Sequence, residues 1–403
     1  MSAIVIDLTQ SSDLRDVVHR AVQVLAEGGI VALPTETVYG LAARALVPEA
    51  VERLGKIKGR GTDHPWTMAV RSFEEAYDYV PTAPLLAQRL ARRCWPGPLT
   101  LVLDRPDHPS LLDELPAAVQ SRVAPGSTIG FRVPAHDVVL DVLQLSIGPL
   151  LLTSANRTGA PPAPDGARIA EQLGEDVDLI LDEGKTRFAQ ASTVVHATDG
   201  VLTVLRPGVL DEAALRRFAS FHIVLLCTGN TCRSPMAECL LRARLARRLD
   251  VPPERLESSG IVIQSAGLNA QGGLPASSQA VAVMAERNLD LTPHRSQPAQ
   301  MQQLEQADLI LTMTAHHRAF LLSHAPHLAP RVHTVRPDGG DVADPIGGPV
   351  EEYRRCAEEI DEALAEWIES LDESWRPFDI VPAGAAPDRS NPIGSAGVAK
   401  PGP

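Results

Sequence analysis

Aromatic residues and long apolar runs are scarce in this sequence of 403 residues. Aromatic side chains make up 4% of it, which disfavours a stacking platform for single-stranded nucleic acid. The longest apolar runs, such as Ile147–Leu152, are far shorter than the ~20 residues of a membrane-spanning helix. The N-terminus lacks the basic start and long apolar stretch of a signal peptide. We therefore expect no membrane association and no secretory signal.

Cysteine is also rare, and its number is odd. Five cysteines spread over a chain of this length argue against a disulfide framework and favour a reducing cytoplasm. No paired Cys/His spacing indicates structural zinc, so we expect no bound metal from these residues. The five positions are Cys94, Cys227, Cys232, Cys239 and Cys356.

Positive charge is in deficit. The chain holds 37 Lys and Arg against 50 Asp and Glu, for a formal net charge of −13. A protein that coats DNA needs concentrated positive charge, so direct DNA binding is not expected, although a local basic pocket is compatible with this balance. Hydrophobic residues at 44% are ordinary for globular proteins, and the length predicts two or three domains.

Three zones follow one another along the chain. In residues 1–215 and again in 220–375, strand-like apolar runs alternate with helical patterns, which predicts α/β domains with mixed or parallel sheets. A short helix is expected at Asp211–Phe218 between them. Residues 376–403 hold 6 Pro and 4 Gly with almost no apolar periodicity, which predicts a disordered tail.

The strongest local motif is Cys227-Thr-Gly-Asn-Thr-Cys-Arg-Ser-Pro235. It follows the apolar run Ile223–Leu226 and precedes a helical pattern, and a tight loop between strand and helix directs backbone N–H groups at an anion. Gly229 and Asn230 suit positive φ, and Pro235 suits a first helical turn.

This loop predicts a reactive thiol. A ring of N–H donors favours the thiolate form of Cys227, and Arg233 can direct its planar guanidinium at the same phosphoryl oxygens. The alternative interpretation is a buried cysteine and a surface arginine on an ordinary turn. The GxxxxGK[ST] spacing of a nucleotide-binding P-loop is absent.

The motif resembles the active-site loop of low-molecular-weight protein tyrosine phosphatases, and the resemblance covers roughly residues 221–372. It implies a three-layer α/β/α domain with a parallel sheet and a phosphatase that needs no cofactor. It also implies that Cys227 is the nucleophile, that Arg233 holds the phosphoryl group and that Asp344, of Asp344-Pro345, is the general acid and then the base. Supporting roles are implied for Thr231, Asn230 and Ser234.

Two details favour the protein-arginine phosphatase branch of this family. Tyrosine-specific members carry aromatic residues just after the Asp-Pro pair, whereas Ile346 follows here. Thr231 occupies a position that is threonine in arginine phosphatases and usually bulkier in tyrosine phosphatases. We expect a phosphoprotein substrate, with phosphoarginine favoured over phosphotyrosine. Cys232 is either a redox partner of Cys227 or a space-filling residue.

In the first zone the informative residues are scattered. An isolated cation inside an apolar strand needs an anionic partner, which makes Arg132 the most telling of them. The others stand in short runs: residues 28–41, Lys58-Gly59-Arg60, 128–134, 150–156, Ser192–Val195 and Leu205–Gly208.

In this order, the runs resemble the threonylcarbamoyl-AMP synthase family (YrdC-like domain) over about residues 10–210. The resemblance implies a twisted mixed-sheet α/β domain with an open groove. For ATP it implies contacts from Lys58, Arg60, Thr128, Asn156 and Arg206. For threonine it implies Thr37, Arg132, Ser154 and Ser192.

The family condenses L-threonine, bicarbonate and ATP into threonylcarbamoyl-adenylate and pyrophosphate, and Mg²⁺ is expected with the ATP. The product is used by tRNA-modifying enzymes. This chain departs from the family pattern at His64, Ala69 and Pro164. The leading interpretation is a bifunctional cytoplasmic enzyme. The alternative is a nucleotide- or RNA-binding sensor domain attached to a nonspecific phosphatase.

Overall fold

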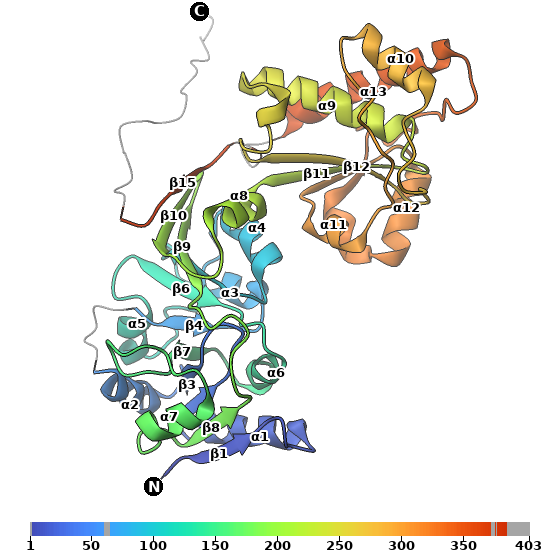
Figure 1. Cartoon of the computed structure of the whole chain (residues 1–403). Coiled ribbons are helices and arrows are strands. Elements are labelled where there is room, and N and C mark those ends of the chain that lie inside the picture. Colours follow the sequence, from blue (N-terminus) through green and yellow to red (C-terminus); the bar gives the residue numbers. More distant parts are fainter. Residues whose placement is uncertain (1, 60–64, 372–374, 376, 385–403) are drawn as a thin grey trace, which may run out of the picture. The chain divides into compact units, whose positions relative to one another are not determined.

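The computed structural model describes residues 2–59, 65–371, 375 and 377–384. The chain divides into two compact units, coloured along the sequence in Figure 1. The first unit contains residues 1–84, 95–211 and 379–403, and the second contains 85–94 and 212–378. Two stretches therefore depart from the division predicted at 215–220: residues 85–94 pack with the second unit, and residues 379–384 return to the first.

Among the described residues, the first unit is built on one mixed sheet with the strand order β1-β8-β2-β3-β7-β4-β6-β5-β9-β10-β15. Parallel and antiparallel neighbours alternate irregularly; for example, β4 pairs parallel with β6 and antiparallel with β7. The strands are β1 (Ile4–Asp7), β2 (Val31–Leu33), β3 (Gly40–Arg44), β4 (Thr67–Ala69), β5 (Leu99–Asp104), β6 (Thr128–Arg132), β7 (Leu150–Ser154), β8 (Leu179–Asp182), β9 (Thr193–Thr198), β10 (Val201–Arg206) and β15 (Asp379–Val381).

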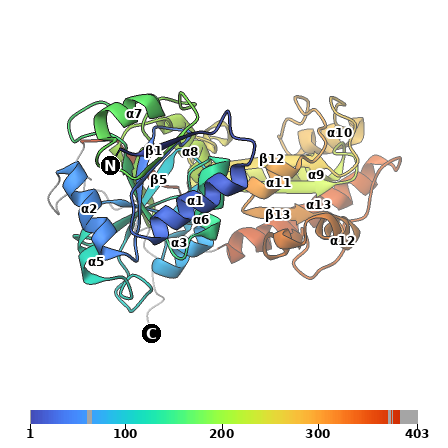
Figure 2. The ribbon, with the colours of Figure 1, turned by 90° about the horizontal axis from the view of Figure 1, so that it is seen from below.

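Helices cover this sheet. They are α1 (Leu14–Ala26), α2 (Pro48–Lys58), α3 (Phe73–Tyr79), α5 (Ala117–Val123), α6 (Asp137–Leu145) and α7 (Gly166–Leu173). Helices α1 and α6 lie side by side, as Figure 2 shows, and pack their apolar faces on β2, β3, β7 and β8. Asp13 caps α1 by accepting hydrogen bonds from two backbone N–H groups of its first turn. The expectation of a mixed α/β domain is confirmed.

Strand β15 lies in the segment that was predicted to be a disordered tail. It pairs parallel with β10, with Leu202 opposite Ile380. The Pro/Gly-rich composition did not reveal it because three residues are too few for a periodic pattern. The rest of the predicted tail, from residue 385, lies outside the described residues.

The second unit is a four-stranded parallel sheet in the order β12-β11-β13-β14. Helices α9, α10 and α13 cover one face and α11 and α12 the other (Figure 1), which confirms the predicted three-layer arrangement. Its elements are α4 (Leu85–Cys94), α8 (Glu212–Ala219), β11 (Phe221–Cys227), α9 (Arg233–Leu249), η1 (Pro253–Arg255), β12 (Ile261–Gly267), α10 (Ser278–Glu286), α11 (Met301–Gln306), β13 (Leu309–Thr312), α12 (Ala315–His324), η2 (Pro326–Arg331), β14 (Val332–Thr334) and α13 (Val350–Ser370).

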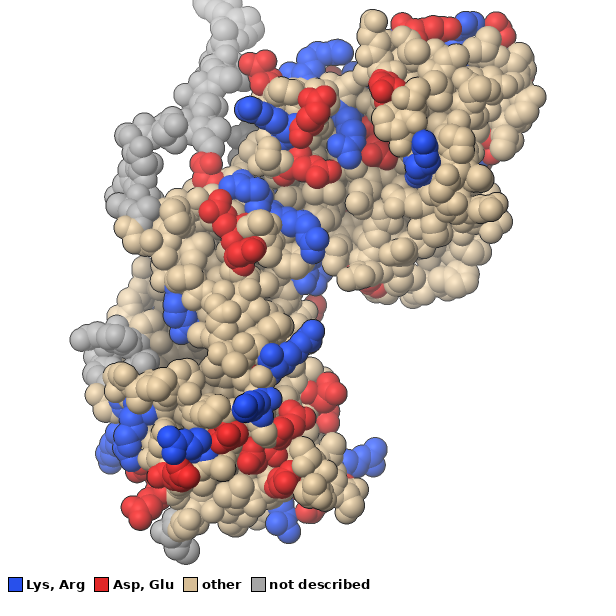
Figure 3. Space-filling view, in the orientation of Figure 1, with Lys and Arg blue, Asp and Glu red and all other residues tan. Residues whose placement is uncertain are grey.

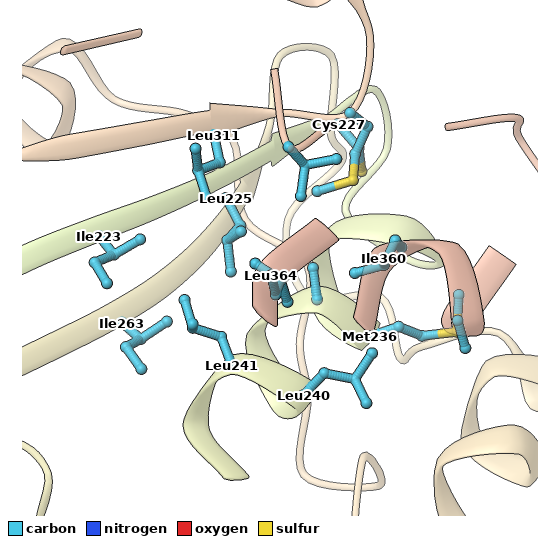
Figure 4. Close-up of a cluster of buried hydrophobic side chains, with 14 of the residues drawn as sticks. Ile223, Leu225, Cys227, Met236, Leu240, Leu241, Ile263, Leu311, Ile360 and Leu364 are labelled. Atoms are coloured by element: carbon cyan, nitrogen blue, oxygen red, sulfur yellow. The ribbon is translucent and has the colours of Figure 1, made fainter. Parts of the chain in front are cut away.

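The central strand β11 shows why this unit folds as three layers. Successive side chains of a strand point to opposite faces. Ile223 and Leu225 pack with α9 and α13, as Figure 4 shows, whereas Val224 and Leu226 belong to the core on the other face. Because both faces are buried, the strand is a continuous apolar run, which is the pattern of parallel sheets. Cys227 is the last residue of this run, at the end of the strand.

Helix α4 is attached to the second unit through a buried carboxylate, Asp308. Arg93, whose side chain is fully buried, approaches Asp308 at 2.6 Å and also donates to the carbonyls of Phe218 and Ser220. Arg89 and Arg92 pair with the same carboxylate. Burial alone would raise the pKa of Asp308, but the three arginines hold it below its ordinary value.

Within the described residues, the helices are either too short or too charged to cross a bilayer. The longest, α13, carries charged residues throughout its 21 residues.

Candidate active sites

The loop from Cys227 to Arg233 brings a backbone N–H group and a hydroxyl group to the thiol of Cys227. Cys227 Sγ lies 3.2 Å from the backbone N of Asn230 and 3.0 Å from Ser234 Oγ. The chain can turn back toward the sulfur because Asn230 adopts a left-handed φ of 53°, as predicted; Gly229, for which the same was predicted, has no positive φ. Cys227 is 3% exposed, so its sulfur is sheltered from bulk water.

Asn230 holds the loop in shape through a fully buried side chain. Its Nδ2 donates to Ser234 Oγ and to Ser265 Oγ, both at 2.9 Å, and its Oδ1 accepts from the backbone N of Gln297 at 2.9 Å. His294 reaches the backbone oxygen of Asn230 at 2.8 Å. The side-chain amide thus uses both donors and its acceptor, which fixes the loop before any ligand arrives.

Arg233 and Asp344 lie together beside this loop. Arg233 Nη2 approaches Asp344 Oδ2 at 2.5 Å, and Nη1 donates to the carbonyl of Val342 at 3.1 Å. The Arg233 side chain is 6% exposed, whereas that of Asp344 is 38% exposed. The arrangement therefore offers a buried cation next to a carboxylate that solvent and a ligand can reach.

Thr231 and Cys232 complete the loop. The carbonyl of Thr231 accepts from the N–H of Ser277 at 2.9 Å, and Cys232 Sγ lies 3.5 Å from the hydroxyl of Tyr353. Burial raises the pKa of Cys94 and of Cys356 to about 12, which keeps both as thiols. The redox role considered for Cys232 stays a prediction.

A histidine that sequence reasoning missed supports the rim of the loop. His317, on α12, is buried and uses both ring nitrogens: Nε2 contacts Thr228 Oγ1 at 2.8 Å and Nδ1 contacts Thr314 Oγ1 at 2.9 Å. Burial, with a smaller effect of nearby Arg233, lowers the pKa of His317 to about 4, so the ring is neutral near pH 7. Its position 89 residues after Thr228 left no local signal in the sequence.

Acid is expected to weaken the second unit through His317. The folded-state pKa of about 4 lies below the ordinary 6.5, so below pH 6.5 the unfolded chain takes up a proton that the folded chain refuses. The contribution of neutral His317 is therefore complete above pH 6.5 and is lost as the pH falls toward 4. We expect His317→Gln to flatten the fall in unfolding free energy between pH 7 and pH 5, measured by urea titration. The exposed neighbour His316→Gln is the control, and equal pH dependence in both variants would contradict the assignment.

Gly267 lets β12 approach the loop. A Cβ at this position would lie 2.5 Å from the carbonyl oxygen of Thr228 and 3.0 Å from the N of Asn230. We expect Gly267→Ala to displace the loop and lower phosphatase turnover by on the order of 10- to 100-fold. Gly272→Ala, where the nearest atom would be 3.8 Å away, is the matched control. Equal steady-state kinetics of the two variants would show that the close approach does not matter.

In the first unit, a pocket of about 230 Å³ opens above the sheet. It is lined by four of the predicted residues, Arg132, Ser154, Ser192 and Arg206. Ser192 Oγ contacts Thr100 Oγ1 at 2.9 Å, and Arg206 Nη2 donates to Ser192 Oγ at 3.0 Å. The structure thus brings residues from β6, β7, β10 and the start of β9 to one place, as the scattered motifs predicted.

Arg132 has an anionic partner within the protein, Glu36. Its Nη2 donates to Glu36 Oε1 and to Thr37 Oγ1, both at 2.7 Å, and the two charged side chains are less than 10% exposed. Arg132 Nε is buried and has no acceptor among the described residues. Sequence reasoning expected a ligand carboxylate here and missed Glu36. A donor remains available on the guanidinium.

Lys58 and Asn156 lie together beside Ser154 and are not among the residues that line the pocket. Lys58 Nζ donates to the carbonyl of Ser154 at 2.8 Å and to Asn156 Oδ1 at 3.0 Å, and Ser154 Oγ also contacts this oxygen. The lysine is buried, and these oxygens compensate its charge. Asn156 is positioned by the contact of its Nδ2 with the carbonyl of Ala160.

The two remaining predicted ATP contacts are Thr128 and Arg60, and neither is among the described residues that line the pocket. Thr128 lies on β6 on the same face as Arg132, four residues away, and is not among the residues that line the pocket. Arg60, like His64, lies outside the described residues. Of the other departures from the family pattern, Ala69 is buried in β4 opposite Arg132, and Pro164 lies at the surface.

Charges of both signs are interspersed over the face shown in Figure 3. Among the described residues there is no cluster of three His, Cys, Asp or Glu side chains that could hold a metal ion.

Two family models match the chain. The Sua5/YciO/YrdC model, described as telomere recombination, matches residues 23–208, and the low molecular weight phosphotyrosine protein phosphatase model matches residues 222–376. A putative threonylcarbamoyl-AMP synthase of Mycobacterium tuberculosis is 36% identical over 50% of this chain and 91% of its own length. A protein-arginine-phosphatase of Geobacillus stearothermophilus is 32% identical over 38% of this chain and 96% of its own length. The chain belongs to both families.

The synthase-family unit thus precedes the phosphatase-family unit along the chain, as the sequence predicts. A threonylcarbamoyl-AMP synthase of Pyrococcus abyssi is 39% identical over 46% of this chain, and the chain spans about half of that relative's length (52%). Among solved structures, a Pyrococcus abyssi Sua5 complexed with L-threonine covers 66% of this chain and 92% of its own at 24% identity, with a TM-score of 0.48. A low molecular weight protein tyrosine phosphatase from T. tengcongensis covers 38% and 100% at 37% identity, with a TM-score of 0.34.

Proposed function

We propose that the phosphatase-family unit removes phosphoryl groups from proteins through a phosphocysteine intermediate. The observation that carries this is the sulfur of Cys227 held by the backbone N–H of Asn230, in a loop that ends at Arg233 with Asp344 paired to it. The thiolate attacks phosphorus, the bond from phosphorus to the leaving group breaks, and Asp344 gives the leaving group a proton. Water then attacks the phosphocysteine, Asp344 takes its proton, and phosphate leaves with the thiolate restored.

Arg233 and the loop N–H groups stabilise the charge that the phosphoryl oxygens carry in this reaction. In the structure Arg233 is bound to Asp344 and to the carbonyl of Val342. An arriving phosphoryl group takes over the guanidinium, and Asp344 is then released toward the leaving group. The reaction needs no metal from the protein in this scheme.

Phosphoarginine is the substrate we favour. The bond that breaks is then P–N, and the released guanidinium is a cation that the carboxylate of Asp344 can pair with. The next side chain beyond Pro345 is Ile346, which is 67% exposed and offers no aromatic ring for a phenol to stack on. Thr231 at the loop supports the same choice, as does the likeness to a protein named protein-arginine-phosphatase.

The substrate proposal is tested with matched peptides. The purified full chain should have a kcat/KM for a phosphoarginine peptide at least tenfold above that for the phosphotyrosine peptide of otherwise equal sequence. Equal kcat/KM values for the two peptides would count against a preference for phosphoarginine but not against the phosphatase proposal. Ile346→Trp should reduce the difference between the two values, because the indole supplies a ring on which a phenol can stack.

We propose that the synthase-family unit forms threonylcarbamoyl-adenylate from L-threonine, bicarbonate and ATP, which brings Mg²⁺ with it. The buried Arg132, with an unused Nε donor, suits the threonine carboxylate, and Thr37 and Ser192 suit its polar groups. Lys58, Asn156 and Arg206 are proposed to contact the nucleotide, with Arg60 and Thr128 as further proposed contacts. The carbamate oxygen attacks the α-phosphorus and pyrophosphate leaves, so the residues chiefly position the reactants and neutralise charge.

In this scheme tRNA-modifying enzymes of the cytoplasm would consume the adenylate. The test is pyrophosphate release by the full chain, which should require ATP, bicarbonate and threonine together. Nucleotide binding without pyrophosphate release would favour the sensor alternative. Arg132→Lys keeps the charge but loses the planar two-donor geometry, and it should raise KM for threonine more than KM for ATP.

A further inference from the structure

A pocket of about 590 Å³ in the second unit is formed by residues that the phosphatase chemistry does not use. Its walls come from edge strand β14, the start of α12, the last turns of α13 and the segment around Pro337. This volume falls within the range of ~300–1,000 Å³ typical of small-molecule sites. The same wall segment continues along the chain to Asp344, seven residues after Pro337.

An aromatic surface forms one side of this pocket. Trp367 and His333 lie with ring centroids 5.2 Å apart and planes tilted by 51°. The indole is fixed because its Nε1 donates to the carbonyl of Val335 at 2.8 Å. Burial, with a smaller effect of Arg318, lowers the pKa of His333, which keeps this ring neutral near pH 7. In a chain with 4% aromatic residues, a partly exposed Trp–His pair in a large pocket is a specific feature.

Charged residues also line this pocket. Arg318 is anchored by Nε, which donates to the carbonyl of Val332 at 3.0 Å, and no carboxylate among the described residues forms an ion pair with it. Its two Nη groups can therefore bind an anion. Arg336 differs, because Asp338 and Glu359 already neutralise it. Glu366 lines the pocket, is exposed, and has no ion pair in the described structure.

The edge strand itself argues against a peptide as the occupant. A peptide that extends a sheet needs unpaired backbone groups along the edge. Here the carbonyls of Val332 and Val335 are already taken by Arg318 and Trp367. Recognition in this pocket therefore falls to side chains, which suits a small molecule.

We propose that this pocket binds a nucleoside monophosphate. The base would lie on Trp367, the phosphate would pair with the Nη groups of Arg318, and an exocyclic amino group would donate to Glu366. AMP carries all three features. An aromatic amino acid also has a ring, an anion and a cation, but it would fill much less of the volume. The site lies in the second unit and is separate from the ATP contacts proposed in the first.

The test is calorimetric titration of the full chain with AMP. Arg318→Met and Trp367→Leu should each weaken AMP binding at this site at least tenfold. Arg318→Lys keeps the charge without the planar donor pair, so its affinity should lie between those of wild type and Arg318→Met. Arg354→Met, a surface arginine paired with Glu286, is the matched control and should bind as wild type. Adenosine, which lacks the phosphate, should bind at least tenfold more weakly than AMP. Thermal unfolding of each variant checks that the unit is folded.

This experiment distinguishes failure of the pocket proposal from failure of the synthase-site proposal. Arg206→Met should remove AMP binding in the first unit and leave the pocket site intact. AMP binding that only Arg206→Met abolishes would overturn the pocket proposal and keep the synthase site. Tighter binding of tryptophan than of AMP, lost in Arg318→Met, would also overturn it, in favour of an amino-acid site.

Discussion

Cys227→Ser is expected to lose phosphatase turnover by on the order of 10⁴-fold or more while pyrophosphate release by the synthase-family unit stays unchanged. The loss follows because a serine hydroxyl is a far weaker nucleophile than a cysteine sulfur. The two sites share no residues, since Cys227 lies at the end of β11 in the second unit and the proposed synthase residues belong to the first unit. Both reactions are measured on one preparation.

Cys239→Ser is the control for this variant, because Cys239 lies on α9 outside the loop from Cys227 to Arg233 and burial raises its pKa to about 11. It should keep both activities. Simultaneous loss of both activities in Cys227→Ser would refute two independent sites. Retained phosphatase turnover would refute the nucleophile assignment.

Arg93→Met is expected to lower the unfolding free energy of the second unit by about 3–5 kcal/mol, the usual cost of leaving a buried charge without its partner. Burial disfavours the charged form of Asp308, and Arg93 is the strongest of the cations that oppose this effect. The variant also removes donors from the carbonyls of Phe218 and Gln306. Urea unfolding followed through phosphatase activity and fluorescence measures the change.

Arg92→Met tests the same carboxylate from a side chain that is 32% exposed, and it should cost much less. Adding Asp308→Asn to Arg93→Met should recover part of the loss, because the uncompensated charge is then gone. Equal costs for the two arginine variants would refute the view that the buried contact dominates.

The phosphatase site could be predicted in large part because its core is one contiguous stretch. A strand, a tight turn and a helix start lie within Cys227–Pro235, so local rules place the thiol, the donors and Arg233 together. Asp344 lies 111 residues after Arg233 and could be named only by family resemblance. His317 and His294 could not be named at all, since each joins the loop through tertiary packing of a distant segment.

In the first unit, Arg132 does have the anionic partner that a buried cation needs, but the sequence did not show that this partner is Glu36. A cation buried in β6 does need an anion, and Glu36 supplies it from a neighbouring turn at 2.7 Å. A sequence pattern shows that a charged side chain will be buried, but it does not show which oxygen atom compensates the charge. The same limit applies to α4: its amphipathic pattern predicts a helix with a buried face and contains no information about which unit covers that face.

The chain passes between the units four times, at residues 84/85, 94/95, 211/212 and 378/379. The phosphatase-family unit is therefore an insertion ahead of β15 and not an appendage. No single backbone cleavage yields two whole enzymes: a cut after residue 211 leaves α4 on the synthase fragment and β15 on the other. A fragment of residues 220–375 would carry Asp308 without any of its three arginines. Each fragment thus retains a structural element of the other unit, so we expect the two fragments of a nicked chain to stay associated through α4 and β15.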